Sequence, residues 1–196
     1  MTEDQSGLVA LIEKIAVGDE TAVSEFYDAT VNRVFGLAMK IVLRPELAEE
    51  VVGDVYLQIW RQARNYNSAK ASPIGWLLMI CRSRALDILR REKSATKNQF
   101  QDDDEKYDLE DESVAMPLDS ILGSEISTRV SDALKLLNKK QREAISLAFY
   151  RDMSHKEIST HTGQPLGTVK SNIRRAQDIL RNVLEKDELG TGGLYG

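Results

Sequence analysis

The segment from Ser154 to Leu184 constrains the fold more than any other part of the sequence, because it carries the signals for two helices joined by a tight turn. Ser154 and Glu157 form an S-x-x-E pattern, in which each side chain satisfies an unpaired backbone N–H at a helix start. Gly163 can adopt the left-handed conformation that ends a helix, and Pro165 supplies a fixed φ at or just before the start of the next one. The sequence therefore predicts a helix that begins at Ser154, a short rigid turn and a second helix.

The second predicted helix has an apolar face and a basic face. Its apolar residues recur at steps of four and three, which places them on one side of a helix with 3.6 residues per turn. They are Val169, Ile173, Ala176, Leu180 and Val183. The opposite side, near the helix N-terminus, carries Lys170, Ser171, Arg174 and Arg175. An ordinary amphipathic helix with a solvated basic face would explain any one of these features, but together they favour a helix-turn-helix whose second helix enters a major groove.

Helical patterns also dominate the rest of the chain. Four prolines, few β-branched alternations and long stretches of Ala, Leu, Glu, Lys and Arg at helical spacing predict an all-α protein, with no convincing strand pattern. A length of 196 residues suits either two small domains or one domain of ordinary size.

The cysteine content and the hydropathy pattern indicate the compartment. Cys81 is the single cysteine, so no disulfide can form within the chain and a reducing cytoplasm fits. Its apolar neighbours predict that it is a small core residue. The N-terminus is acidic, and no apolar run approaches the roughly 20 residues needed to cross a bilayer. We therefore expect a cytoplasmic protein that is neither exported nor membrane-spanning.

The net charge of −5 argues at first against nucleic acid, because phosphate binding favours a basic surface. The charges are segregated, however. Residues 1–60 hold eleven acidic and four basic side chains, residues 98–125 hold ten and one, and residues 135–186 hold five and eleven. A protein with one basic end and one acidic end is expected to bind DNA weakly alone and to depend on another protein for delivery.

The N-terminal half is predicted to begin with a short amphipathic helix that ends near Gly18. Asp19 should cap a long helix that runs to Leu43 with a regular apolar period. Arg44 and Pro45 interrupt this period, because the residue before proline is steered away from helix while proline suits a first turn.

The next predicted helix runs from Pro45 to about Arg64 and changes character along its length. Its first half is acidic, which suits the positive end of the helix macrodipole. The acids are Glu46, Glu49, Glu50 and Asp54. On physical grounds they either bind a partner or only solvate and stabilise the helix, and both alternatives stay open.

A polar loop from Asn65 to Ser72 precedes a basic helix that begins at Pro73. The apolar residues that this helix is predicted to bury are Trp76, Leu77, Ile80, Leu86 and Leu89. Its outward residues are Arg82, Arg84, Arg90, Arg91 and Lys93. Single-stranded nucleic acid binds to this combination of cations for phosphates and aromatic surfaces for bases. The alternative is a core helix whose Lys and Arg side chains extend to solvent, and the C-terminal motif decides in favour of nucleic acid.

Residues 95–124 lose the helical period and crowd acidic side chains together, which predicts a disordered linker. This run lacks the glycine turns with which loops space ligands for hard cations, so we expect no metal there. His155 and His161 have no cysteine nearby and match no zinc pattern. No cofactor is predicted.

The pattern resumes near Glu125 with a helix through Val130, Leu134 and Leu137, followed by a helix from about Lys139 to Tyr150. These helices are expected to support the helix-turn-helix. The predicted division of the chain is therefore an N-terminal helical bundle over residues 1–94, an acidic linker over 95–124, a helix-turn-helix domain over 125–186 and a flexible tail over 187–196.

Three stretches, taken in order, resemble the bacterial sigma-70 family, and specifically its small two-domain extracytoplasmic-function (ECF) group. They are PELAEEVVGDVYLQIWRQARNY, WLLMICRSRALDILRRE and QPLGTVKSNIRRAQDIL. The resemblance covers roughly residues 8–93 and 125–186. The stretches EFYDATVNRVFGLAMKI and FYRDMSHKEIS are similar to the SigK-like subgroup, whose members are held by a membrane-anchored anti-sigma factor.

The resemblance implies a sigma factor that binds core RNA polymerase at the β′ clamp helices and the β flap, recognises promoter DNA and initiates transcription under the control of an anti-sigma factor. The residues that it implies for core binding are Glu50, Val51, Asp54, Val55 and Gln58. Those implied for the minus-ten element are Tyr66, Trp76, Ser83, Arg84, Asp87 and Arg90. Those implied for the minus-thirty-five element are Thr168, Lys170, Ser171, Arg174 and Arg175.

The sequence departs from the family at Ser83 and Asp87, where many relatives carry asparagine, so the base preference at the minus-ten element does not transfer. No nucleophile, general base and orienting group occur in a catalytic pattern, and no glycine-rich phosphate loop is present, so nothing favours an enzyme or a small-molecule substrate. The alternative function is a stand-alone helix-turn-helix transcriptional regulator. Its N-terminal half would act as a sensor and would need a ligand pocket or a phosphoacceptor site.

Overall fold

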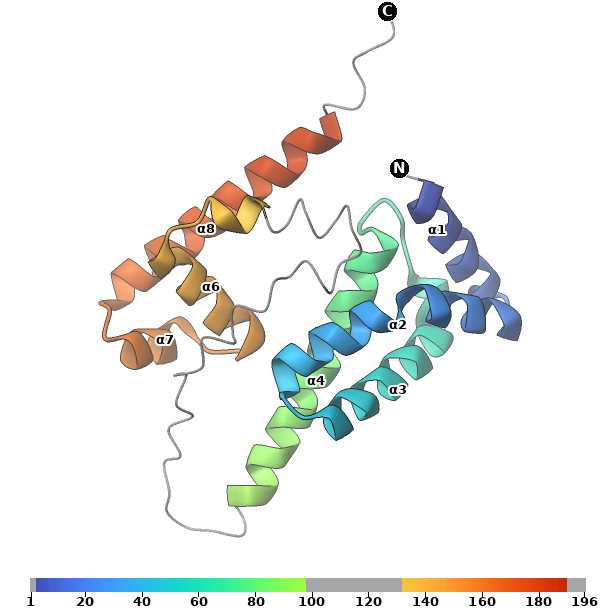
Figure 1. Cartoon of the computed structure of the whole chain (residues 1–196), viewed down its shortest axis with the longest axis horizontal. Coiled ribbons are helices and arrows are strands. Elements are labelled where there is room, and N and C mark those ends of the chain that lie inside the picture. The colour runs from blue at the N-terminus through green and yellow to red at the C-terminus, as the bar shows by residue number, and fades with distance from the viewer. Residues whose placement is uncertain (1–2, 98–131, 190–196) are drawn as a thin grey trace, which may run out of the picture. The chain divides into compact units, whose positions relative to one another are not determined.

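The computed structural model describes residues 3–97 and 132–189, and the chain divides into two compact units, residues 1–114 and 115–196. Both units are helical and no strand occurs in the described ranges, which confirms the predicted all-α class (Figure 1). None of the helices in these ranges is both long and apolar enough to cross a membrane. The acidic segment of 98–131 and the end of the tail at 190–196 lie outside the described residues.

The first unit contains four helices in its described part, in which α2, α3 and α4 pack on one another and α1 packs mainly on α2 (Figure 1). Their bounds are α1 Glu3–Ala16, α2 Glu20–Val42, α3 Pro45–Gln62 and α4 Pro73–Lys97, with a 3-10 turn η1 at Ala63–Asn65. The basic helix α4 thus extends three residues past the predicted domain boundary at 94.

Local signals determine where α2 begins and ends. The Asp19 carboxylate accepts hydrogen bonds from the backbone N–H groups of Thr21 and Ala22 at 2.9 and 3.2 Å. A further hydrogen bond from the Thr21 hydroxyl is the largest cause that lowers the pKa of Asp19. The helix ends at Val42 because Leu43, the residue at which it was predicted to end, adopts a left-handed conformation with φ 59°. Leu43 therefore caps α2 before the chain turns into α3.

Aliphatic and aromatic side chains from all four helices form the core of the first unit. Its largest fully buried members are Phe26, Ile12, Ile15, Ile41, Ile59, Leu77, Val34, Val51 and Val55. Thr30 is buried among them, and its hydroxyl shares a hydrogen bond of 2.7 Å with the hydroxyl of Tyr56. This bond joins α2 to α3.

Cys81 is fully buried in the same core, as predicted, and its Sγ donates a hydrogen bond of 3.4 Å to the carbonyl oxygen of Val34. Burial raises the pKa of the Cys81 thiol to about 12, because the apolar core disfavours the thiolate.

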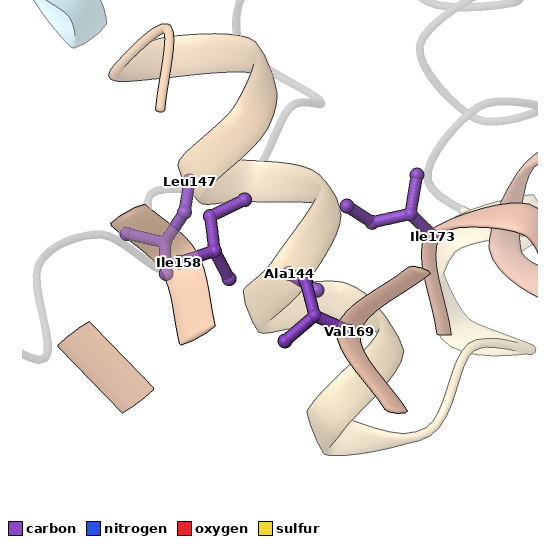
Figure 2. Close-up of a cluster of buried hydrophobic side chains, with 5 residues drawn as sticks. All are labelled: Ala144, Leu147, Ile158, Val169 and Ile173. Carbon is purple, nitrogen blue, oxygen red and sulfur yellow. The ribbon is translucent and has the colours of Figure 1, made fainter. Parts of the chain in front are cut away.

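The second unit contains α6 Lys139–Tyr150, α7 His155–Thr162 and α8 Leu166–Leu189. Residues 132–135 are also helical, and the remainder of the helix predicted from Glu125 lies outside the described residues. Asn138 and Gln141 form a capping box at the start of α6, whose bounds agree with the prediction. Five buried side chains join the three helices: Ala144 and Leu147 from α6, Ile158 from α7, and Val169 and Ile173 from α8 (Figure 2).

Candidate nucleic-acid interface

The turn between α7 and α8 has the predicted geometry. The Ser154 hydroxyl accepts a hydrogen bond from the N–H of Glu157 at 3.3 Å, and the Glu157 carboxylate accepts one from the N–H of Ser154 at 2.7 Å. Gly163 caps α7 in the left-handed conformation with φ 67°. Both helix-end signals read from the sequence are confirmed: Ser154 caps the start of α7, and Gly163 ends it at the turn into α8.

A polar contact that sequence reasoning missed holds this turn on α8. The Gln164 carbonyl accepts a hydrogen bond of 2.6 Å from the Ser159 hydroxyl, and the Gln164 side-chain oxygen accepts one of 3.2 Å from the amide of Asn172. Asn172 is buried beside Val169 and Ile173. A polar residue on an otherwise apolar helix face was the signal that could have revealed this contact.

The two faces of α8 differ as predicted. Val169, Ile173 and Ala176 are buried, whereas Leu180 and Val183 are half-buried. The polar face presents the four exposed side chains Thr168, Lys170, Arg174 and Arg175 together with the half-buried Ser171. The Ser171 hydroxyl donates to the Thr168 carbonyl at 2.9 Å, and Arg174 Nε lies 4.0 Å from the Asp178 carboxylate. We name these five residues the α8 surface.

In the first unit, the acidic residues of α3 lie beside a basic residue of α4. Glu50 is exposed and Asp54 is half-buried. Their carboxylates lie 3.7 and 4.0 Å from Nη2 of Arg91. These are long ion pairs at the surface of the unit, which contribute little to stability.

Val51 and Val55, which the resemblance grouped with these acids, are fully buried in the core of the first unit. A step of one residue along a helix turns a side chain by about 100°, so both valines point to the bundle when Glu50 and Asp54 point to solvent. They offer no surface to a partner, and we remove them from the set of direct contacts.

The loop before α4 carries an aromatic pair. The rings of Tyr66 and Trp76 lie 5.1 Å apart at 45°, and both side chains are half-buried. The Tyr66 hydroxyl donates to the carbonyl of Ala71 at 2.9 Å, and burial raises the pKa of Tyr66. Ser72 closes the loop by accepting a hydrogen bond from the N–H of Gly75 at 3.1 Å.

The other residues predicted for this surface follow along α4. Ser83 is exposed, and Arg84 is half-buried with its Nε 2.6 Å from the side-chain oxygen of Gln58 on α3. Asp87 and the exposed Arg90 form an ion pair at 3.0 Å. Trp76 and Leu89, which were both expected to be buried, are half-buried. We name the side chains of Tyr66, Trp76, Ser83, Arg84, Asp87 and Arg90 the α4 surface.

No group of three or more His, Cys, Asp or Glu side chains in the described ranges is arranged to hold a metal ion. His155 and His161 are both exposed.

Comparison with known proteins identifies relatives of both units. Residues 26–95 match the family model described as Sigma-70 region 2, and residues 127–177 match the one described as Sigma-70, region 4. The chain is 35% identical over 180 residues to the "ECF RNA polymerase sigma factor SigK" of Mycobacterium tuberculosis (strain ATCC 25618 / H37Rv). The aligned residues cover 92% of this chain and 95% of that relative. It is 35% identical over 178 residues to the protein of the same name from Mycobacterium ulcerans (strain Agy99), with 91% and 94% covered. Among solved structures, SigE of Rhodobacter sphaeroides in complex with the anti-sigma ChrR is 31% identical, with 91% of this chain and 98% of that chain covered and a TM-score of 0.47.

Proposed function

Since this chain belongs to the sigma-70 family, among the ECF RNA polymerase sigma factors, we propose that its two units divide promoter recognition between them. As a sigma factor it binds core RNA polymerase, recognises the minus-ten and minus-thirty-five elements and initiates transcription. The observation that supports the division is the presence of a cationic surface on each unit, at the α8 surface and at the α4 surface. Because α4 continues to Lys97 and α8 to Leu189, past the predicted boundaries at 94 and 186, we assign residues 1–97 to core binding and the minus-ten element, 98–124 to the linker, 125–189 to the minus-thirty-five element and 190–196 to a tail.

The α8 surface is assigned to the minus-thirty-five element. Exposed cations and hydroxyl groups near the N-terminus of a second helix suit contact with base edges and phosphates of a major groove. The buried face of the same helix supports this role, because Val169 and Ile173 hold α8 on α6 and α7 while the polar side chains stay available.

The α4 surface is assigned to the minus-ten element. Tyr66 and Trp76 offer an aromatic surface against which an unpaired base can stack, and Arg84 and Arg90 offer cations for the adjoining phosphates. Extruding a base from a duplex costs a few kcal/mol of unstacking. Capture of that base by the aromatic pair would offset this cost at the site of melting, without any bond being made or broken by the protein.

Glu50 and Asp54 are assigned to docking on the β′ clamp helices of core polymerase. Carboxylates on a helix surface suit a basic partner, and their long ion pairs with Arg91 leave them able to exchange partners. The second unit is assigned to the β flap. Such a protein works where RNA polymerase works, in the cytoplasm, and we further propose an anti-sigma factor of the membrane-anchored kind as its regulator.

The test is transcription in vitro with core polymerase in the presence and absence of the purified chain. We expect promoter-specific initiation only when the chain is present, and weak binding of the same duplex by the chain alone at physiological salt. Tight sequence-specific binding without polymerase would instead support the stand-alone regulator.

A further inference from the structure

Gln58 is hydrogen bonded at both ends of its side-chain amide within the first unit. Its Oε1 accepts from Nε of Arg84 on α4 at 2.6 Å, and its Nε2 donates to Oε1 of Gln62 one turn further along α3 at 3.0 Å. Gln58 and Arg84 are both half-buried and are separated by 26 residues in the sequence. The contact therefore depends on how α3 packs against α4 (Figure 1).

This contact restricts the orientation of the Arg84 side chain. A guanidinium group is planar and carries five N–H donors in a rigid fork, so a hydrogen bond at Nε restricts the directions open to the four N–H groups on Nη1 and Nη2. Within the described residues, Gln58 is the one hydrogen-bond partner of the Arg84 side chain. The four remaining donors are consequently restricted in direction without being used in this contact.

We propose that Gln58 is a positioning residue for minus-ten recognition, which holds the Arg84 guanidinium ready for the phosphates or bases of the separated strand. The inference rests on the proposed function, because it takes Arg84 to be a contact of the minus-ten element. It also replaces the core-docking role that the resemblance implied for Gln58, because the side-chain amide is already oriented by two hydrogen bonds within the first unit. Glu50 and Asp54 need release only a long contact with Arg91.

The expected benefit is entropic. An arginine that is ordered only when DNA binds loses rotamer freedom at that moment, whereas an arginine held beforehand has already lost it. Removing the hydrogen bond between Gln58 and Arg84 should therefore weaken open-complex formation and leave the affinity for core polymerase unchanged.

The experiment compares Gln58→Ala with the matched control Gln5→Ala, which truncates the same residue type at another half-buried position of the first unit, on α1. Each full-length variant is assembled with core polymerase, and open-complex formation is followed by permanganate reactivity while core affinity is measured by titration. We expect Gln58→Ala to lower the open-complex equilibrium by about 2- to 12-fold, the range for immobilising one long side chain. The control should stay within about 2-fold of the parent. Weaker core binding by Gln58→Ala would overturn the proposal and return Gln58 to the docking surface.

Two further variants separate positioning from other roles. Gln58→Glu keeps an acceptor oxygen for Arg84 and should retain more open complex than Gln58→Ala, and an equal loss in both would overturn the proposal. In an Arg84→Ala background, Gln58→Ala should have no additional effect. If the losses of open complex caused by Arg84→Ala and Gln58→Ala add in the double variant, the positioning role is also overturned.

The single variant Arg84→Ala distinguishes the failure of this inference from the failure of the proposed function. If Arg84→Ala leaves minus-ten use unchanged, the assignment of Arg84 is wrong and the positioning role falls with it. If Arg84→Ala lowers open-complex formation and Gln58→Ala does not, the positioning inference alone is wrong. Circular dichroism of each variant checks that the helices remain formed.

Discussion

Arg174 and Arg175 project from the surface of α8 opposite its buried face, so alanine at either position should leave folding intact. An arginine that reads a guanine edge contributes about 1 to 3 kcal/mol of discrimination between bases. One that only contacts phosphate weakens all sequences alike and lowers the salt slope of binding by about one. We expect at least one of Lys170, Arg174 and Arg175 to be of the first kind, measured by initiation from promoters with altered minus-thirty-five elements. If all three alanine variants keep the preference of the parent, α8 does not read this element.

Cys81 makes the stability of the first unit depend on pH in the alkaline range. Burial raises its pKa to about 12 in the folded state, against about 8.5 in an unfolded chain. Because the folded state holds the proton more tightly, the stabilisation is complete below about pH 8.5 and is lost as the pH rises towards the folded pKa. We expect the free energy of unfolding to fall by about 1 kcal/mol between pH 8 and 9.5. Urea denaturation should show that the free energy of unfolding depends less on pH in Cys81→Ala than in the parent protein. Equal pH dependence in the two proteins would show that the Cys81 thiol is not the group responsible.

Residue-level contacts between helices were the part that the sequence could not predict. The bonds from Thr30 to Tyr56 and from Gln58 to Arg84 each join residues 26 positions apart. No local pattern encodes such a pair, because the partners meet only once the helices have packed. The burial of Val51 and Val55 was missed for a related reason: the resemblance carried a block of positions without separating the two faces of α3.

At the scale of the elements, prediction succeeded wherever a helix end has a local chemical signal. The capping residues Asp19 and Ser154 and the left-handed Gly163 are all confirmed. The end of α3 was predicted at Arg64, yet the α-helix stops at Gln62 and continues as the 3-10 turn η1. Neither proline nor glycine marks this change, so the sequence pattern runs through it.

Ser154 should contribute measurably to the stability of α7. Replacing it with alanine removes the acceptor for the N–H of Glu157, and the loss of such a cap costs about 1 kcal/mol. We expect a lower unfolding midpoint for the helices of the second unit, measured by thermal circular dichroism. Thr160→Ala is the matched control, because the exposed Thr160 hydroxyl only bonds back to the Lys156 carbonyl within α7. An equal effect of the two changes would show that the cap is not responsible.

At the scale of the whole molecule, docking on core polymerase should depend on the sign of charge on α3. Asp54→Lys replaces a half-buried carboxylate with a cation beside Arg91 and should weaken association with core polymerase while the helices remain formed. Glu25→Lys on α2 is the control, because it makes the same charge reversal at an exposed position of another helix. A titration against labelled core polymerase measures both. Equal affinities for the two variants would mean that the acids of α3 serve only to solvate the helix.

The small core of the second unit, with the five side chains of Figure 2 at its centre, has a consequence for the response to heat. The largest fully buried side chains of the described ranges lie mostly in the first unit, and only Ile158 and Val169 belong to the second. Because buried apolar surface provides most of the resistance to unfolding, scanning calorimetry should resolve two transitions, with α6, α7 and α8 melting first. Between the two midpoints the chain would keep α3, which is assigned to the β′ clamp helices, while α8 and the rest of the unit assigned to the β flap are unfolded. A warmed cell would then contain a factor that occupies polymerase without reading the upstream element, so gene expression from its promoters would cease before the protein itself is lost.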